Sequence, residues 1–112
     1  MTRTLNFIRF ALLTSCLIGA PAFSAEKELV LVIKDHQFTP SELRVPAGQK
    51  VKIIIDNQDA TPEEFESHDL NREKVIAAKS KASLFIGPLK AGRYTFVGEF
   101  HEATAKGVVI AE

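Results

Sequence analysis

The segment ELRVPAGQKVKIIID, residues 42–56, contains two short strand patterns on either side of a turn. Polar and apolar side chains alternate in residues 42–45, and the Pro-Ala-Gly that follows is a typical turn sequence. Residues 49–56 alternate at first and then become continuously apolar, which is typical of a half-buried strand entering a sandwich core. The segment therefore predicts two strands of opposite direction in an all-β domain.

Similar patterns continue on both sides of this segment. Further strands are expected at residues 28–34, 64–67, 72–77, 81–87, 93–100 and 107–112, and we expect residues 72–77 to pair with residues 81–87. Several short strands separated by turns predict an all-β sandwich or small barrel. Because alternate residues of a half-buried strand face inward, the predicted core consists of Val30, Val32, Phe38, Val45, Val51, Ile53, Ile55, Phe65, Leu84, Ile86, Tyr94, Phe96, Val108 and Ile110.

Residues 1–25 have the pattern of a secretory signal peptide. A basic start with Arg3 and Arg9 precedes an apolar run and small residues, which predicts cleavage after Ser24 or Ala25. The apolar run is shorter than the roughly 20 residues that span a bilayer. The sequence LTSC at residues 13–16 also resembles a lipoprotein signal. Cleavage there would leave a further apolar stretch in the mature chain directly after the lipid-bearing cysteine. We therefore expect a periplasmic domain of residues 26–112 that is not embedded in the membrane.

Cleavage of this signal would change the chemistry that the chain offers. The one cysteine, Cys16, and the one methionine, Met1, would both be lost, so no thiolate, thioether or disulfide would remain. The chain has 14 basic and 14 acidic residues, and the loss of Arg3 and Arg9 leaves a net charge of about −2. This charge argues against nucleic-acid binding, which needs a basic face. The sequence also lacks the Gly-x-Ser-x-Gly nucleophile motif.

An antiparallel up-and-down path predicts which loops share one end of the domain. The connection before residues 42–45, the loop after residue 56 and the loop after residue 100 all lie at one end. These loops and their flanking residues carry the candidate metal ligands His36, Glu64, Glu66, Glu99, His101 and Glu102. Imidazole suits copper, zinc and iron, and carboxylates shift the preference toward harder ions such as Fe(III). The alternative is that these are solvated loop charges, as we expect for His68.

Two stretches of the chain are similar to cupredoxins. FTPSELRVPAGQKVKIIIDNQD, residues 38–59, resembles their opening, and YTFVGEFHEATAKGVVI, residues 94–110, resembles their closing strand–loop–strand. This resemblance implies an antiparallel Greek-key β-sandwich of about seven or eight strands. It implies that His101 is the loop ligand and that Glu64 stands at the position of the first histidine ligand.

The resemblance also implies which cupredoxin ligands this chain lacks. Gly98 stands in place of the cysteine, and Ala105 or Lys106 stands in place of the methionine. Without a thiolate the chain cannot form a blue type 1 copper centre. Any bound copper would therefore have nitrogen and oxygen ligands.

Within this superfamily the chain most resembles the periplasmic cupredoxin-like component of bacterial ferrous-iron uptake systems. The resemblance lies in EEFES, EKVI and GEFH at residues 63–67, 73–76 and 98–101. It implies oxidation of Fe(II) to Fe(III), assisted by bound copper, with an iron-binding periplasmic protein and an iron permease as partners. Two alternatives stay open: a periplasmic copper carrier without redox activity, and a β-sandwich interaction module with a vestigial site.

Overall fold

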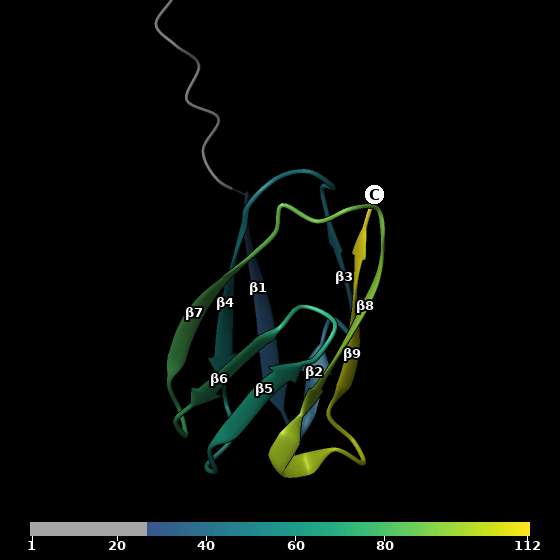
Figure 1. Ribbon diagram of the computed structural model, residues 1–112. Helices are drawn as coiled ribbons and strands as arrows, with labels where there is room; N and C mark the ends of the chain where they lie inside the picture. The colour runs from purple at the N-terminus through teal and green to yellow at the C-terminus, as the bar shows by residue number, and fades with distance from the viewer. Residues whose placement is uncertain (1–26) are drawn as a thin grey trace, which may run out of the picture.

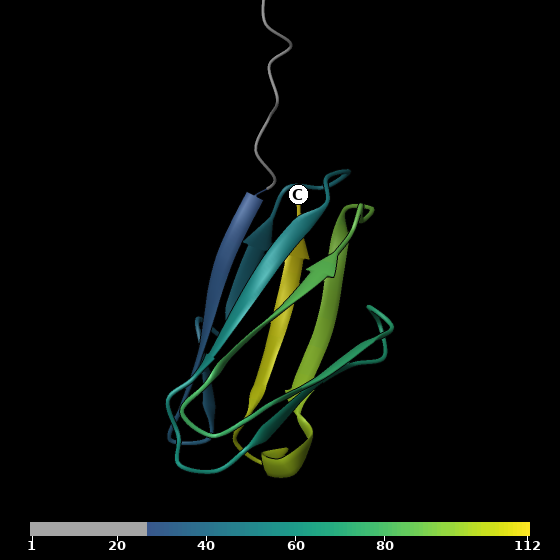
Figure 2. The ribbon, with the colours of Figure 1, turned by 90° about the vertical axis from the view of Figure 1, so that its left-hand side faces the viewer.

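The computed structural model describes residues 27–112, which form a β-sandwich of two layers (Figures 1 and 2). The predicted signal peptide lies outside the described residues. One layer is a four-stranded sheet with the order β2-β1-β4-β7, and the other is a five-stranded sheet with the order β3-β9-β8-β5-β6. Within residues 27–112, no helix is both long and apolar enough for a membrane crossing.

The described part of the chain contains nine strands and one 3-10 helix. They are β1 (Lys27–Lys34), β2 (Gln37–Thr39), β3 (Glu42–Val45), β4 (Val51–Asn57), β5 (Glu63–Ser67), β6 (Arg72–Ile76), β7 (Lys81–Ile86), β8 (Gly92–Gly98), η1 (Glu99–His101) and β9 (Lys106–Ala111). All predicted strands are present, with bounds that differ by at most two residues. The short strand β2 and the helix η1 were not predicted.

The predicted sandwich is confirmed, but its sheets are mixed rather than purely antiparallel. Strand β4 runs parallel to β1, and β9 runs parallel to β3. The chain returns through β2 and β3 before it enters β4, so β4 comes to lie beside β1 in the same direction. The predicted pairing of β6 with β7 is wrong, because β6 forms a hairpin with β5 and β7 joins β4 in the other sheet.

The core lies between the two sheets, and most of its predicted members are buried. Strand β4 buries Val51, Ile53 and Ile55, as its alternation predicted. Of the other predicted residues, Phe38, Val45, Phe65, Leu84, Ile86 and Phe96 are buried and Tyr94 is partly buried.

The predicted inward faces of β1 and β9 are wrong. In β1 the buried residues are Leu31 and Ile33, and Val30 is 51% exposed. The register explains this, because Leu31 lies directly opposite the buried Ile55 of β4, and directly opposed residues share a face of the sheet. In β9, Val109 and Ala111 are buried in place of Val108 and Ile110. Both strands are apolar on both faces, so alternation alone could not distinguish the two registers.

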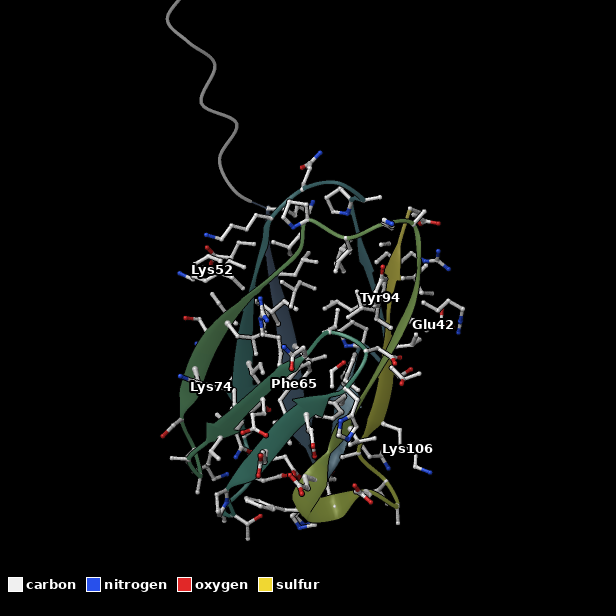
Figure 3. All side chains as sticks on the ribbon, viewed as in Figure 1. Glu42, Lys52, Phe65, Lys74, Tyr94 and Lys106 are labelled. Carbon is white, nitrogen blue, oxygen red and sulfur yellow. The ribbon has the colours of Figure 1, made fainter. Side chains whose placement is uncertain are left out.

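Three phenylalanine rings join the layers next to the loop-rich end. Phe38 from one sheet lies edge-on to Phe65 and Phe96 from the other, with ring centroids 6.2 and 5.0 Å away. Phe65, labelled in Figure 3, also contacts Phe96 at a centroid distance of 5.0 Å. A Cβ atom at Gly107 would lie 2.3 Å from the Phe96 ring, so this position needs glycine for space. The cluster therefore packs the two sheets against each other next to these loops.

Three connections meet at one end of the sandwich, the lower end in Figure 1. They are the turn after β1, the loop after β4 and the segment that joins β8 to β9. Hydrogen bonds join them directly, since Asp59 accepts from the backbone N–H of His36 and Thr104 donates to the His36 carbonyl. The shared end that strand direction predicted is therefore present, and we call it the loop pole.

The register of β1 predicts unequal costs for two neighbouring substitutions. Leu31→Ala should lower the free energy of unfolding by about 2–5 kcal/mol, because it opens a cavity in the core. Val30→Ala is the matched control and should cost less than about 1 kcal/mol, since Val30 faces solvent. Urea unfolding of both variants measures the difference. The reverse order of costs would show that β1 has the other register.

Candidate metal centre

A buried carboxylate lies beneath His101 at the loop pole. Glu63 is the first residue of β5, and its side chain is only 1% exposed. Its Oε2 atom lies 2.6 Å from Nδ1 of His101, and its Oε1 atom accepts hydrogen bonds from the backbone N–H groups of Phe100 and Glu64 at 2.9 and 3.0 Å. Both oxygens are therefore partnered, as a buried carboxylate requires.

The helix η1 holds His101 over this carboxylate. The chain leaves β8 at Gly98 and turns through residues 99–101 before it enters β9. The loop is closed by backbone hydrogen bonds from Thr104 and Ala105 to the His101 carbonyl, at 3.1 and 2.8 Å, and from Gly98 to the Ala105 carbonyl at 2.8 Å. The Phe100 N–H bond to Glu63 ties this loop to β5.

The turn after β1 presents His36 to the same place. Asp35 and His36 have positive φ angles of 53° and 57°, an uncommon backbone conformation for residues other than glycine. Asp59 supports this turn, because its carboxylate accepts hydrogen bonds from both N–H groups at 2.8 and 3.0 Å. The same carboxylate lies 3.4 Å from Nδ1 of His36. Partial burial alone would raise the pKa of Asp59, but these hydrogen bonds and the nearby His36 and Lys79 lower it overall.

The loop that carries Asp59 is held by Asn57, which is 1% exposed at the end of β4. Its Nδ2 group lies within hydrogen-bond distance of the carbonyls of Thr61, Ile76 and Ala77, at 2.9–3.2 Å. Its Oδ1 atom accepts from the N–H of Asp59 at 3.0 Å. One buried amide therefore fixes the path of the loop between β4 and β5.

The three side chains come close enough to share one ion. The rings of His36 and His101 are stacked, with centroids 3.6 Å apart and planes 11° from parallel. One ligand atom from each of His36, Glu63 and His101 can be chosen so that all three lie within 4.8 Å of one another. Ligands bound to one ion at about 2.1 Å lie at most about 4.2 Å apart. Because imidazole nitrogens bind in the plane of the ring and these two planes are nearly parallel, binding would also require the rings to turn toward a common point.

Two imidazoles and one carboxylate fit a borderline or hard cation. This donor set suits copper(II), zinc and iron, and two histidines with one carboxylate are also the ligands of many non-haem Fe(II) sites. Residues 27–112 contain neither cysteine nor methionine, so the described residues do not fit a blue copper centre. The fit is therefore to an ion with nitrogen and oxygen ligands.

The structure brings together two of the six predicted ligands, His36 and His101. The carboxylate beside them is Glu63 and not its predicted neighbour Glu64. Alternation along β5 explains the difference: Glu63 faces inward with the buried Phe65, and Glu64 and Glu66 face the other side. Glu63 and Asp59 were not chosen from the sequence, although the burial expected of Phe65 implied the inward orientation of Glu63.

The other predicted carboxylates lie outside this group. Glu64, Glu66 and Glu99 form a separate acidic group with Glu73, which lies opposite Glu66 in β6. Partial burial and then the Glu99 carboxylate raise the pKa of Glu64. Hydrogen bonding with Glu99 and then partial burial raise the pKa of Glu66.

The last predicted ligand, Glu102, and the predicted surface histidine, His68, both lie at the surface. Glu102 is exposed and follows η1 directly. His68 has a side chain that is 92% exposed and lies 3.4 Å from Glu66, which agrees with its prediction as a surface histidine. A surface hollow of about 370 Å³ lies beside the turn between β5 and β6, and neither His36 nor His101 lines it.

Comparison with known proteins places this geometry in a family context. A family model described as "Cupredoxin-like domain" matches residues 7–111. The protein RP394 of Rickettsia prowazekii (strain Madrid E) is 46% identical over 83 residues, which are 74% of this chain and 66% of that protein. The chain thus spans just under two thirds of the length of this relative.

Solved structures with the same fold include copper proteins. Auracyanin A, a blue copper protein of Chloroflexus aurantiacus, has a TM-score of 0.68 and 15% identity over 79% of this chain and all of its own. A copper binding protein in its apo form has a TM-score of 0.66 and 18% identity over 76% of this chain and 86% of its own. A reduced amicyanin variant has a TM-score of 0.61 and 23% identity over 81% of this chain and 88% of its own. At sequence identities this low, the similarity to these structures shows a shared fold and nothing more.

The acidic group predicts an effect of Glu99→Gln on two neighbours. The pKa values of Glu64 and Glu66 should fall toward the usual 4.5, because a repelling and hydrogen-bonding carboxylate is removed. An NMR titration of the carboxyl carbons measures this change, with Glu102→Gln as the matched control. Unchanged pKa values in the Glu99 variant would show that the group does not interact.

The same shifts fix the sign of a pH effect. A raised carboxyl pKa means that the folded state keeps its proton at a pH where the unfolded chain has lost it. The contribution of Glu64 and Glu66 to stability is therefore present below pH 4.5 and is lost as the pH rises through their raised pKa values. Glu99→Gln should make this loss smaller.

Proposed function

The chain belongs to the cupredoxin-like domain family, and on that premise we propose that it binds a copper or iron ion at its loop pole. The residues that would hold the ion are His36, Glu63 and His101. The observation that carries the proposal is the approach of two stacked imidazoles and one buried carboxylate to within 4.8 Å.

Each of these residues would contribute differently. Glu63 would supply a hard oxygen ligand that is already held in place by two backbone N–H groups. His101 would supply an imidazole that must be neutral to bind, so binding would release a proton wherever the imidazole is charged. Asp59 would act through His36, because a carboxylate beside the non-ligating nitrogen orients a ligand imidazole and raises its basicity.

We further propose that the protein acts in the periplasm in iron uptake. A bound Cu(II) ion would supply an acceptor for one electron from Fe(II), giving Fe(III) and Cu(I), with dioxygen as the final oxidant. Support comes from the resemblance of residues 63–67 and 98–101 to the cupredoxin-like component of ferrous-iron uptake systems. The acidic group of Glu64, Glu66 and Glu99 also lies nearby and would attract cations. An iron-binding periplasmic protein and an iron permease are the proposed partners.

A copper carrier without redox activity is the second candidate. The observation that favours it is the exposure of the two imidazoles, with side chains 42% exposed at His36 and 27% at His101. An ion held by partly exposed ligands at a pole is accessible for transfer to another protein. The third candidate, an interaction module with a vestigial site, requires no metal binding at all.

Calorimetric titration with Cu(II) tests the ligand assignment. Glu63→Gln and His101→Ala should each weaken binding by about 10-fold or more. His68→Ala is the matched control for the histidine and should bind as the wild type does. Glu64→Gln removes only a nearby charge and should weaken binding much less than Glu63→Gln does. Affinity should also fall at low pH, because an imidazole must lose its proton to bind the ion. Loss of binding in the Glu64 variant with retention in the Glu63 variant would move the site to the other side of β5.

An Fe(II) oxidation assay separates the three candidate functions. The redox proposal predicts that the copper-loaded protein speeds the loss of Fe(II) in air, and that His101→Ala abolishes the effect. A carrier would bind copper without speeding Fe(II) loss, and an interaction module would do neither. Free Cu(II) at the same concentration is the control, since dissolved copper also reacts with Fe(II).

A further inference from the structure

We propose that Gly98 determines the metal selectivity of the loop pole, because the absence of a side chain there makes room for the carboxylate of Glu63. Gly98 is the last residue of β8 and lies opposite Phe65 of β5, two residues beyond Glu63. The part of this inference that concerns metal selectivity rests on the proposed function, because it requires that an ion binds at the loop pole. The other part, that a side chain at position 98 and the Glu63 carboxylate cannot occupy the same space, holds for the metal-free protein as well.

The backbone at Gly98 does not itself require glycine. Its φ and ψ angles are −89° and 106°, in the extended region that all residues adopt. The glycines with positive φ among the described residues are Gly48, Gly87 and Gly92. The reason for glycine at position 98 must therefore be the space around it.

That space is already occupied. A Cβ atom at Gly98 would lie 2.7 Å from Cδ of Glu63, 3.0 Å from its Oε1 atom and 2.7 Å from Cβ of Ala105. Carbon atoms in van der Waals contact are normally about 3.5–4.0 Å apart. Ala105 is fully buried and Glu63 nearly so, so neither can move away into solvent.

Glu63 is also held against displacement by its hydrogen bonds. Its Oε1 atom, one of the atoms that a side chain at Gly98 would meet, accepts from the N–H groups of Phe100 and Glu64. Moving the carboxylate would break the hydrogen bonds of these partly buried N–H groups and of His101, which is costly. A side chain at position 98 and an inward carboxylate at position 63 therefore compete for one place.

Whichever of the two side chains fills this space decides whether an oxygen or a sulfur atom is offered to the ion. With glycine at position 98, the place is filled by a carboxylate oxygen, which favours Cu(II), iron and other borderline or hard ions. With cysteine there and a small residue at position 63, a thiolate would take the place and favour soft Cu(I). Gly98 thus acts by positioning Glu63 and does not itself bind the ion.

A double-mutant cycle in the metal-free protein tests the competition for space. Gly98→Ala should lower Tm in the wild-type background and should lower it by less than half as much in the Glu63→Ala background. Relief is partial because Ala105 also meets the new methyl group. Equal losses of Tm in the two backgrounds would overturn the inference. If Gly98→Ala alone fails to fold, recovery of the fold in the double variant also supports it.

The second test uses Cu(II) as the probe in cysteine variants. Gly98→Cys alone should give no intense thiolate-to-copper absorption, because Glu63 occupies the place of the sulfur. Gly98→Cys combined with Glu63→Ala should give that absorption and a higher preference for Cu(I) over Cu(II). Glu63→Ala alone is the control and should give neither. An intense band from Gly98→Cys alone, at wild-type Tm, would contradict the proposal.

Together, the two tests show whether the proposed metal binding or the proposed role of Gly98 has failed. If the wild type does not bind Cu(II) but the metal-free cycle shows coupling between positions 63 and 98, the proposed function fails and the competition for space stands. If the wild type binds Cu(II) through Glu63 but the cycle shows no coupling, the role of Gly98 is wrong and the function stands.

Discussion

Burial of the Glu63 carboxylate is the constraint on which the loop pole depends. It is the only acidic side chain that is buried among residues 27–112, and a buried carboxylate is costly unless it is fully hydrogen-bonded. Its partners, the N–H of Phe100 and the ring of His101, belong to the segment between β8 and β9. The carboxylate thereby joins β5 to η1 and holds an imidazole at the surface. Gly98 leaves the space in which it lies.

The second half of the pole follows the same physical rule. Asn57, also buried, provides the hydrogen bonds that hold the loop after β4, and this loop places Asp59 under the turn of Asp35 and His36. Each histidine therefore has a carboxylate near its Nδ1 atom, and the two rings stack at 3.6 Å. Two uncharged imidazoles can stack in this way. A bound cation would need the two rings to turn so that one nitrogen of each, together with a Glu63 oxygen, points at the ion. Phe38, Phe65 and Phe96 pack against one another in the core next to this pole.

The sequence predicted the strands and the shared pole well, because turn residues and strand direction are local properties of the chain. It could not predict the inward face of β1 or β9, since both faces of these strands are apolar and their registers depend on β4, β3 and β8. The parallel pairings were missed because they join strands far apart in the chain. At the candidate site, the structure brings the predicted residues His36 and His101 together, and their role as ligands stays a prediction. Glu64 was chosen because it matches the position of a cupredoxin ligand. The alternation of β5 around Phe65 turns Glu63 inward instead.

The central claim is that a single ion binds at the loop pole between His36, Glu63 and His101. It is tested most directly by a crystal structure of the Cu(II)-loaded protein, with anomalous diffraction recorded at the copper absorption edge. We expect one strong anomalous peak in contact with both imidazoles and with the Glu63 carboxylate. A peak bound only by Glu64, Glu66 and Glu99, or one without either histidine of the pole, would contradict it.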